Sequence, residues 1–317
     1  MDLDLAQVRA FVAAAEELHF GRAAGRLFLT QQALSKRIAR LEDELGVRLL
    51  TRDRHGVQLT EAGRRFLAPA RQALADGDRA IEAARNPGRP LRIDVWGHLY
   101  APMRTLEQVI EQAPGLPTEL GRSRDLPAAM ISLLSGEIDA GFGRVHPASG
   151  EDHERLISRL VRLEPVDAVI GSGHPLAGLP QLRPADLRQS ILYCPAALRR
   201  LDFLRRFAEA FGIPVQDDGA NLGLDHLISR LRAGPGLFSL LPADIALPAD
   251  AGVHQVPLAD PTPLYAWSLT WRRQDDNPLL RSLLERFAET GRRLRWLNHD
   301  PARDWLPVSD YAGLQPP

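Results

Sequence analysis

Residues 20–63 read FGRAAGRLFLTQQALSKRIARLEDELGVRLLTRDRHGVQLTEAG and decide the fold of the amino-terminal part. Apolar spacing predicts a short helix over 22–27, a turn at Phe28 and Leu29, and a longer helix that begins after Thr30. The Thr30 hydroxyl is placed to cap the longer helix, and Gly46 to end it. A basic hairpin and the start of another helix follow. This order of elements is typical of a module that lays one helix in a DNA groove.

A first amphipathic helix precedes this stretch, and residues 19–21 are expected to break it. Its apolar positions recur at helical spacing: Leu5, Val8, Phe11, Val12 and Ala15. The helix after Thr30 has a similar apolar stripe. We expect that stripe to be buried and to consist of Ala33, Leu34, Ile38, Leu41 and Leu45.

The opposite face of the helix after Thr30 carries candidate DNA contacts. With the cap, they are Thr30, Gln31, Gln32, Ser35, Lys36 and Arg40. Glutamine pairs with adenine edges, lysine with guanine edges, and serine with bases or phosphate. Most of them lie in the first two turns, the end that a helix-turn-helix points at bases. An ordinary solvated helix face is equally polar and stays the alternative for this helix alone.

Residues 47–59 predict a short hairpin with Gly56 near its turn. Arg52, Arg54 and His55 would lie at its tip, where they could contact phosphate or the minor groove. After a helix-turn-helix, such a hairpin is the expected wing.

At this point the residues resemble a known family. The pattern A-A-x-R-L…T-Q-Q-A-L-S-K-R-I-x-R-L-E-x-E-L-G-V-x-L-L-x-R…G-V-x-L-T-E-A-G is similar to the winged helix-turn-helix of LysR-type transcriptional regulators, over roughly residues 3–85. Gln32 stands where the family often has proline or serine, and Leu50 where phenylalanine is common. The resemblance implies a DNA-binding regulator controlled by a small molecule.

Thr60 can cap the next helix, which we expect over 61–85. Its apolar or small residues repeat in alternating threes and fours, the spacing of a heptad seam: Leu67, Ala70, Leu74, Gly77, Ile81 and Ala84. The family resemblance implies that this helix pairs with a second subunit, in a homodimer or homotetramer. The alternative is a stripe buried against its own domain.

Asn86-Pro87-Gly88-Arg89-Pro90 ends the helix, and the pattern then changes to alternating strands and helices. Strands are expected over 91–96, 117–120, 136–142, 163–171, 190–194, 237–241 and 265–271. Helices are expected over 102–112, 126–135, 201–211, 224–233 and 279–294. This alternation implies an α/β fold with a parallel sheet.

The second part resembles, more loosely, the family's effector-binding domain, which has two periplasmic-binding-protein-like α/β lobes. The segments S-G-E-I-D-A-G-F, G-S-G-H-P-L and R-A-G-P-G-L-F-S-L-L-P carry the likeness. We therefore expect a DNA-binding domain over 1–60, a linker helix and hinge over 61–88, and an effector domain over 91–296. Lobe I would comprise 91–161 and 266–296, and lobe II 162–265. A tail would cover 297–317, with Trp305 anchored on the surface and its end loose.

Ligands of such sheets bind beyond the carboxyl ends of the strands. The candidate effector residues, expected between the lobes, therefore follow strands: Gly97, His98, Leu99, Arg122, Ser123, Arg144, Pro195 and Asn221, with Ala196 and Gly223 as neighbours. Helix N-termini and arginines favour an organic anion. For Arg122 and Arg144 a solvated loop position is the alternative.

Composition narrows the functional classes. The net charge of −1 gives the protein no overall attraction to DNA, so an argument for DNA binding must rest on a local cluster of basic residues. Lys36 is the only lysine. No metal or catalytic motif is present, so neither a cofactor nor an enzyme is predicted. Cys194 is the only cysteine, which excludes an internal disulfide and suits a cytoplasmic location. No membrane contact is predicted, and RNA polymerase is a further expected partner if the regulator activates. A solute-binding or enzymatic α/β protein with amino-terminal assembly helices is the competing interpretation.

Overall fold

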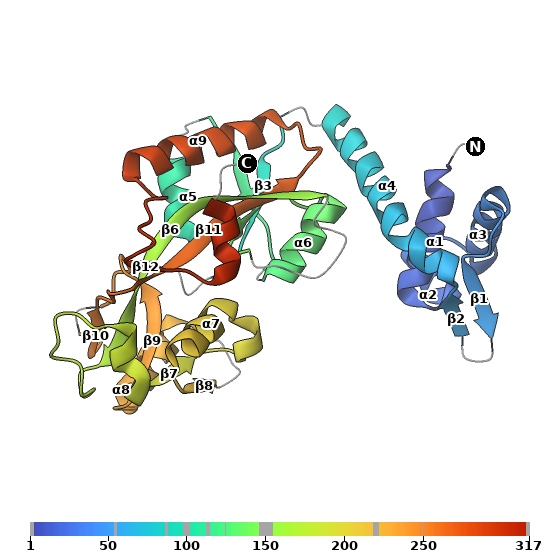
Figure 1. Cartoon of the computed structure of the whole chain (residues 1–317). Coiled ribbons are helices and arrows are strands. Elements are labelled where there is room, and N and C mark those ends of the chain that lie inside the picture. The colour runs from blue at the N-terminus through green and yellow to red at the C-terminus, as the bar shows by residue number, and fades with distance from the viewer. Residues whose placement is uncertain are drawn as a thin grey trace. The chain divides into compact units, whose positions relative to one another are not determined.

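A computed structural model (Figure 1) describes residues 3–53, 56–85, 88–97, 102–111, 115–123, 125–145, 155–217, 222–248 and 250–314. The chain forms two compact units. The first is Met1–Arg89, with Leu134–Glu137 grouped with it, and the second is Pro90–Leu133 with Ile138–Pro317.

The first unit is helical with one hairpin. Its elements are α1 (Leu5–Glu17), α2 (Phe20–Arg26), α3 (Gln31–Leu45), β1 (Leu50–Asp53), β2 (Gly56–Leu59) and α4 (Glu61–Arg85). Its core is made of buried apolar side chains from all of these helices, among them Phe11, Phe20, Leu34, Ile38, Leu41, Leu49 and Ala70. Ala33 and Leu45 of the predicted α3 stripe are only partly buried.

The predicted break at residues 19–21 is wrong by one or two positions. Leu18 ends α1 in the left-handed conformation, with φ 47°. His19 then caps α2, because its Nδ1 accepts the N–H groups of Gly21 and Arg22 at 3.1 and 3.2 Å. Phe20 and Gly21 therefore already belong to α2.

The apolar stripe of α4 has two parts. Phe66 packs on Phe11 of α1 with ring centroids 5.5 Å apart, and Ala70 and Leu74 are buried in the core of their own unit. Toward the carboxyl end of α4, Ile81 is 50% exposed, and Ala84 is exposed as well. Self-burial, the alternative for this stripe, is thus confirmed for its first half, while its last turns offer apolar surface.

The second unit is built on one long sheet of order β4-β3-β5-β11-β6-β9-β7-β8, with β10 paired to β6 and β12 to β11. Its strands are β3 (Leu91–Val95), β4 (Thr118–Leu120), β5 (Ala140–Gly143), β6 (Leu156–Gly171), β7 (Ile191–Cys194), β8 (Val215–Asp217), β9 (Leu237–Pro242), β10 (Val253–Val256), β11 (Thr262–Arg272) and β12 (Asp304–Trp305). Its helices are α5 (Pro102–Ile110), α6 (Leu126–Ser135), α7 (Asp202–Phe211), α8 (Leu224–Ala233), α9 (Pro278–Leu294) and the 3₁₀ turns η3 (Pro184–Gln189), η4 (Leu198–Arg200) and η5 (Val308–Leu314).

The expected parallel sheet is only partly correct. Strands β3, β4 and β5 pair in parallel, and so do β7, β8 and β9. These two groups are joined by β6 and β11, which run antiparallel to each other. Strand β6 begins at Leu156 rather than at residue 163, and the lobe boundaries expected at 161/162 and 265/266 fall inside β6 and β11. The two lobes therefore share their central pair of strands.

The tail after α9 is packed against the rest of the unit around Trp305, as expected, and residues 315–317 at its end lie outside the described residues. Strand β12 pairs in parallel with the start of β11. Trp305 meets the rings of Phe203, Phe207 and Phe211 on α7 at centroid distances of 5.8, 5.6 and 5.4 Å. Leu306 is only 2% exposed and packs against apolar residues of β6 and β11. The tail thus covers the shared strands and reaches α7.

Candidate functional sites

Helix α3 separates a buried face from a polar face, as its sequence predicts. Gln31, Gln32, Lys36 and Arg40 are exposed, and Ser35 is half-buried. The Thr30 hydroxyl accepts the N–H of Ala33 at 3.2 Å, so it caps the helix. The polar side chains are therefore held on the outside by a stripe that is fixed in the core.

Glu42 connects α3 to the hairpin, and its role was not predicted from the sequence. Its buried carboxylate accepts the N–H groups of Leu49 and Leu50 at 2.8 and 3.0 Å and pairs with Arg48 at 2.8 Å. These bonds satisfy two buried backbone donors at the base of β1. The sequence did offer a sign that this carboxylate is buried: Glu42 lies on the apolar stripe of α3, directly after Leu41.

A close backbone approach fixes the other end of the hairpin. The Thr60 hydroxyl donates to the carbonyl of Arg48 at 2.7 Å and accepts the N–H of Gly63 at 2.9 Å. A Cβ atom on Gly63 would lie 2.1 Å from the carbonyl oxygen of Leu49. Arg52 lies on β1 opposite Val57. Arg54 and His55 lie outside the described residues.

In the second unit, the candidates Gly97 and Arg144 follow the neighbouring strands β3 and β5. The indole of Trp96 donates to the carbonyl of Arg144 at 3.0 Å, which ties the two strand ends together. Gly97 has φ 89°, and a Cβ there would lie 3.3 Å from the Trp267 ring and 3.5 Å from the Tyr265 hydroxyl. Glycine is therefore needed for this backbone to lie against the two rings.

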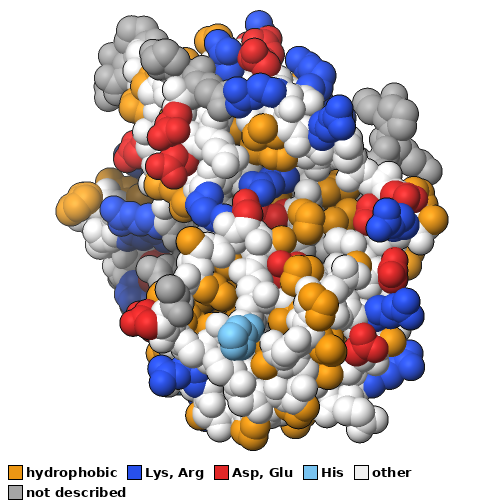
Figure 2. All heavy atoms as spheres, turned by 90° about the vertical axis from the view of Figure 1, so that its left-hand side faces the viewer, with side chains coloured by type: hydrophobic (Ala, Val, Ile, Leu, Met, Phe, Trp, Pro, Cys, Tyr) orange, Lys and Arg blue, Asp and Glu red, His pale blue; other side chains and the backbone are white. Residues whose placement is uncertain are grey.

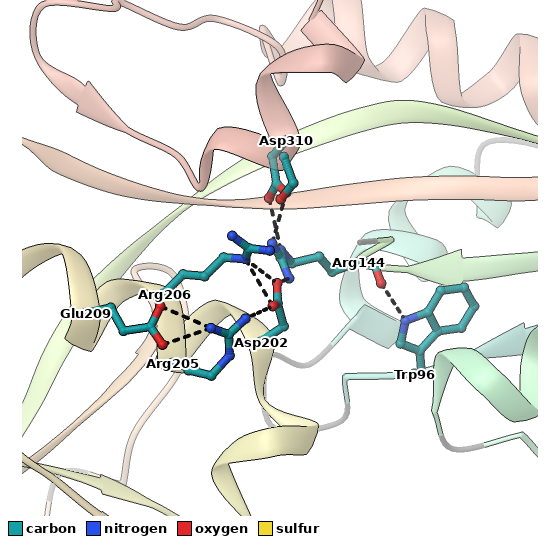
Figure 3. Close-up of polar contacts among 8 residues, drawn as sticks. Trp96, Arg144, Asp202, Arg205, Arg206, Glu209 and Asp310 are labelled. Carbon is teal, nitrogen blue, oxygen red and sulfur yellow. Dashed lines mark hydrogen bonds and ion pairs between the residues drawn. The ribbon is translucent and has the colours of Figure 1, made fainter. Parts of the chain in front are cut away.

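Arg144 is buried and paired with side chains of the same chain, so the alternative of a solvated loop position is wrong for it. Its guanidinium is 4% exposed and pairs with Asp310 of η5 and Asp202 of α7 (Figure 3). Burial would raise the pKa of Asp202, but hydrogen bonds from Arg144, Arg205 and Arg206 outweigh it and hold that pKa at about 2. Asp202 is thus a carboxylate at all ordinary pH values.

The other candidate effector residues do not join this cluster. The N–H of Ser123 donates to Asp94 at 3.1 Å, and its hydroxyl lies 3.4 Å from that of Ser132. Arg122 is exposed, and Pro195 is buried. His98, Leu99 and Asn221 lie outside the described residues. Among the described candidates, Gly97 and Arg144 lie nearest to this cluster, at the ends of β3 and β5.

A second buried polar cluster lies at the middle of β6, and it too was missed. Glu164 accepts the indole N–H of Trp267 at 2.7 Å and pairs with Arg162 at 2.9 Å. Asp244, after β9, pairs with Arg162 at 3.2 Å and with Arg104 of α5 at 2.8 Å. Burial raises the pKa of Glu164 to about 7, although the charge of Arg162 and the bond from Trp267 oppose the rise.

Charges of both signs are interspersed with apolar side chains on the face that Figure 2 shows. That mixture does not favour a nucleic acid there. Among the described residues, no helix is long and apolar enough to cross a membrane, and no group of three potential metal ligands gathers.

Both units match models of known protein families. Residues 5–64 match the model of the bacterial regulatory helix-turn-helix protein, lysR family, and residues 85–292 match the LysR substrate binding domain. The chain belongs to the LysR family of transcriptional regulators. It is a DNA-binding regulator with an effector-binding domain, so the competing interpretation as an enzyme is wrong.

Named relatives of this LysR regulator match it along nearly its whole length. It is 32% identical over 300 residues to the HTH-type transcriptional regulator IlvR of Caulobacter vibrioides, covering 91% of this chain and 99% of IlvR. It is 30% identical over 293 residues to AlsR of Bacillus subtilis, covering 89% and 94% of the two chains.

Solved LysR-family structures share its fold. Full-length BenM is 26% identical with a TM-score of 0.53, covering 94% of this chain and all 100% of BenM. Full-length CbnR bound to its target DNA is 22% identical with a TM-score of 0.58, covering 91% and 100%.

Proposed function

We propose that this LysR regulator reads promoter DNA with the exposed face of α3. The carrying observation is that Gln31, Gln32 and Lys36 are exposed at the start of a helix whose other face is locked in the core. Thr30 and Ser35 lie beside them, and Arg40 extends the same face toward phosphate. Arg52 and Arg54 of the wing supply further backbone contacts.

Two copies of the module are needed for tight binding, because one copy offers few cations to the phosphates. The exposed Ile81 and Ala84 of α4 supply an apolar end for pairing with a second copy of this chain. We infer a homodimer or a homotetramer that acts in the cytoplasm, and contact with RNA polymerase where it activates.

The effector site of the regulator is proposed at the ends of β3 and β5, around Gly97 and Arg144. Arginine holds carboxylates through two parallel bonds, and the buried rings of Tyr265 and Trp267 lie against Gly97 at the same strand ends. An organic carboxylate therefore suits the site best. His98, Leu99 and Asn221 remain candidate contacts by their positions in the sequence.

A gel shift on the DNA upstream of the gene tests the DNA-binding face. Lys36→Ala and Gln32→Ala are expected to weaken binding by about 1–3 kcal/mol, which is roughly 5- to 150-fold. Arg281→Ala, an exposed arginine on α9, is the matched control and should bind like the wild type. Unchanged affinity in both α3 variants would contradict the assignment.

A further inference from the structure

The carboxylate of Asp310 is bound to Arg144 in the way an arginine binds a carboxylate ligand. Arg144 Nη2 lies 2.9 Å from Oδ1 and Nε lies 3.0 Å from Oδ2, while Nη1 pairs with Asp202 at 2.7 Å (Figure 3). The side chains of Arg144 and Asp310 are 4% and 2% exposed. Two parallel bonds of this kind are the strongest and most specific that a guanidinium makes.

Apart from the pair with Arg144, the described side chains of residues 308–311 are mostly at the surface, and the Tyr311 ring meets that of His299 in the same tail, with centroids 5.7 Å apart. Val308 is 85% exposed and Tyr311 is 36% exposed, and Ser309 is only partly buried. The anchor of this turn to the rest of the chain comes earlier, where Trp305 and Leu306 pack on α7 and the shared strands. The turn can therefore leave Arg144 while Trp305 and Leu306 stay in place.

The surroundings of Arg144 suit a bound organic acid. Phe203 lies beneath the guanidinium, 5.9 Å from it, and Tyr265 stands 5.0 Å from Phe203 and 4.7 Å from Trp267. These rings are buried in the present structure, so a ligand carboxylate that displaced Asp310 from Arg144 would enter an aromatic surrounding rather than open surface. The matched family domain ends at residue 292, so the segment that delivers Asp310 lies beyond it.

We propose that residues 308–311 are an intramolecular ligand, and that a small carboxylate effector binds by displacing Asp310 from Arg144. This inference rests on the proposed effector site. The bound tail lowers the apparent affinity for the effector, because only the fraction with a free Arg144 can bind it. Displacement of Asp310 then releases residues 308–311 from Arg144, which follows β5.

Calorimetry on the full chain tests the proposal, with phenylacetate as the carboxylate probe and phenylacetamide as its neutral counterpart. Asp310→Ala and Asp310→Asn should bind phenylacetate at least tenfold more tightly than the wild type, and none of the three proteins should prefer the amide. Asp300→Ala, a change to an exposed carboxylate of the same tail, should bind like the wild type. Affinities within twofold of the wild type in both Asp310 variants would overturn the proposal.

Hydrogen exchange on the wild type gives a second measurement that does not depend on how the variants fold. Saturating phenylacetate should speed amide exchange at Asp310 while leaving β12 protected. An unchanged exchange rate at Asp310 with the probe bound would overturn displacement. A gel shift on the same samples separates this proposal from the proposed DNA-binding function. If neither the wild type nor any variant bound DNA, the DNA-binding proposal would be contradicted. Displacement of the tail is decided by calorimetry and hydrogen exchange alone.

Discussion

The carboxylate of Glu42 holds the backbone N–H of Leu49 at 2.8 Å, so the last full turn of α3 and the first strand of the wing are joined by one buried side chain. The same carboxylate also takes the N–H of Leu50. The polar face of α3 and the wing are therefore positioned together.

Replacing Glu42 by alanine should destabilise the DNA-binding unit. Two buried backbone donors would lose their acceptor, which costs roughly 2–4 kcal/mol in the free energy of unfolding. Urea unfolding measures the change. Asp43→Ala, next to it but exposed, should stay within about 0.5 kcal/mol of the wild type. Equal stability of the two variants would show that Glu42 does not hold the wing.

Gly63→Ala should disturb the same junction from the other side. The added Cβ would stand 2.1 Å from the carbonyl oxygen of Leu49, so the backbone must shift. Such overpacking costs roughly 1–3 kcal/mol and should weaken DNA affinity with it. Gly25→Ala in α2 is the matched control, since nothing lies within 4 Å of its added Cβ. That change should leave stability equal or higher, because alanine favours a helix.

Stability should fall as pH rises through neutrality because of Glu164. Its pKa is about 7 in the folded chain, against 4.5 for an exposed glutamate, so between these values the folded state holds a proton that the unfolded state has lost. The stabilisation is complete below pH 4.5 and is lost as pH rises through 7. Relative to Glu164→Gln, the wild type should lose about 3 kcal/mol of unfolding free energy over this range. Thermal melts at several pH values measure this, and Glu285→Gln should reproduce the wild-type profile.

Cys194 should be unreactive in the folded regulator. Its thiol is buried at the end of β7, and burial, assisted by the charge of Asp217, raises its pKa to about 12. Since the thiolate is the reactive form, a thiol reagent at pH 8 should label it only after unfolding. Rapid labelling of the native protein would show instead that the thiol is accessible and reactive.

Local signals predicted much of the fold. Helices α4, α6 and α8 have the bounds expected from apolar spacing, caps and breakers, all of which act within a few residues. The buried and polar faces of α3 also followed from spacing alone. These features depend on residues close together in the sequence, so they can be predicted from a single amino-acid sequence.

Long-range pairings could not be read in this way. Asp310 reaches Arg144 across 166 residues, and nothing in the sequence of either segment points to the other. Arg144 was correctly placed after a strand, but its occupant was not foreseen. The first half of β6 was missed because its exposed Ser158 and Arg159 interrupt the apolar run that marks a buried strand.

Strand β6 runs through both lobes, and this has a consequence for how the chain can change in length. Side chains along a strand alternate between two faces, so one residue gained or lost near Glu164 would turn every later side chain of β6 to the opposite face. One lobe would then present its core side chains to solvent while the other kept its arrangement. Insertions and deletions during evolution, or in a domain-exchange experiment, are therefore restricted to the connecting loops, and the two lobes must be inherited as one piece.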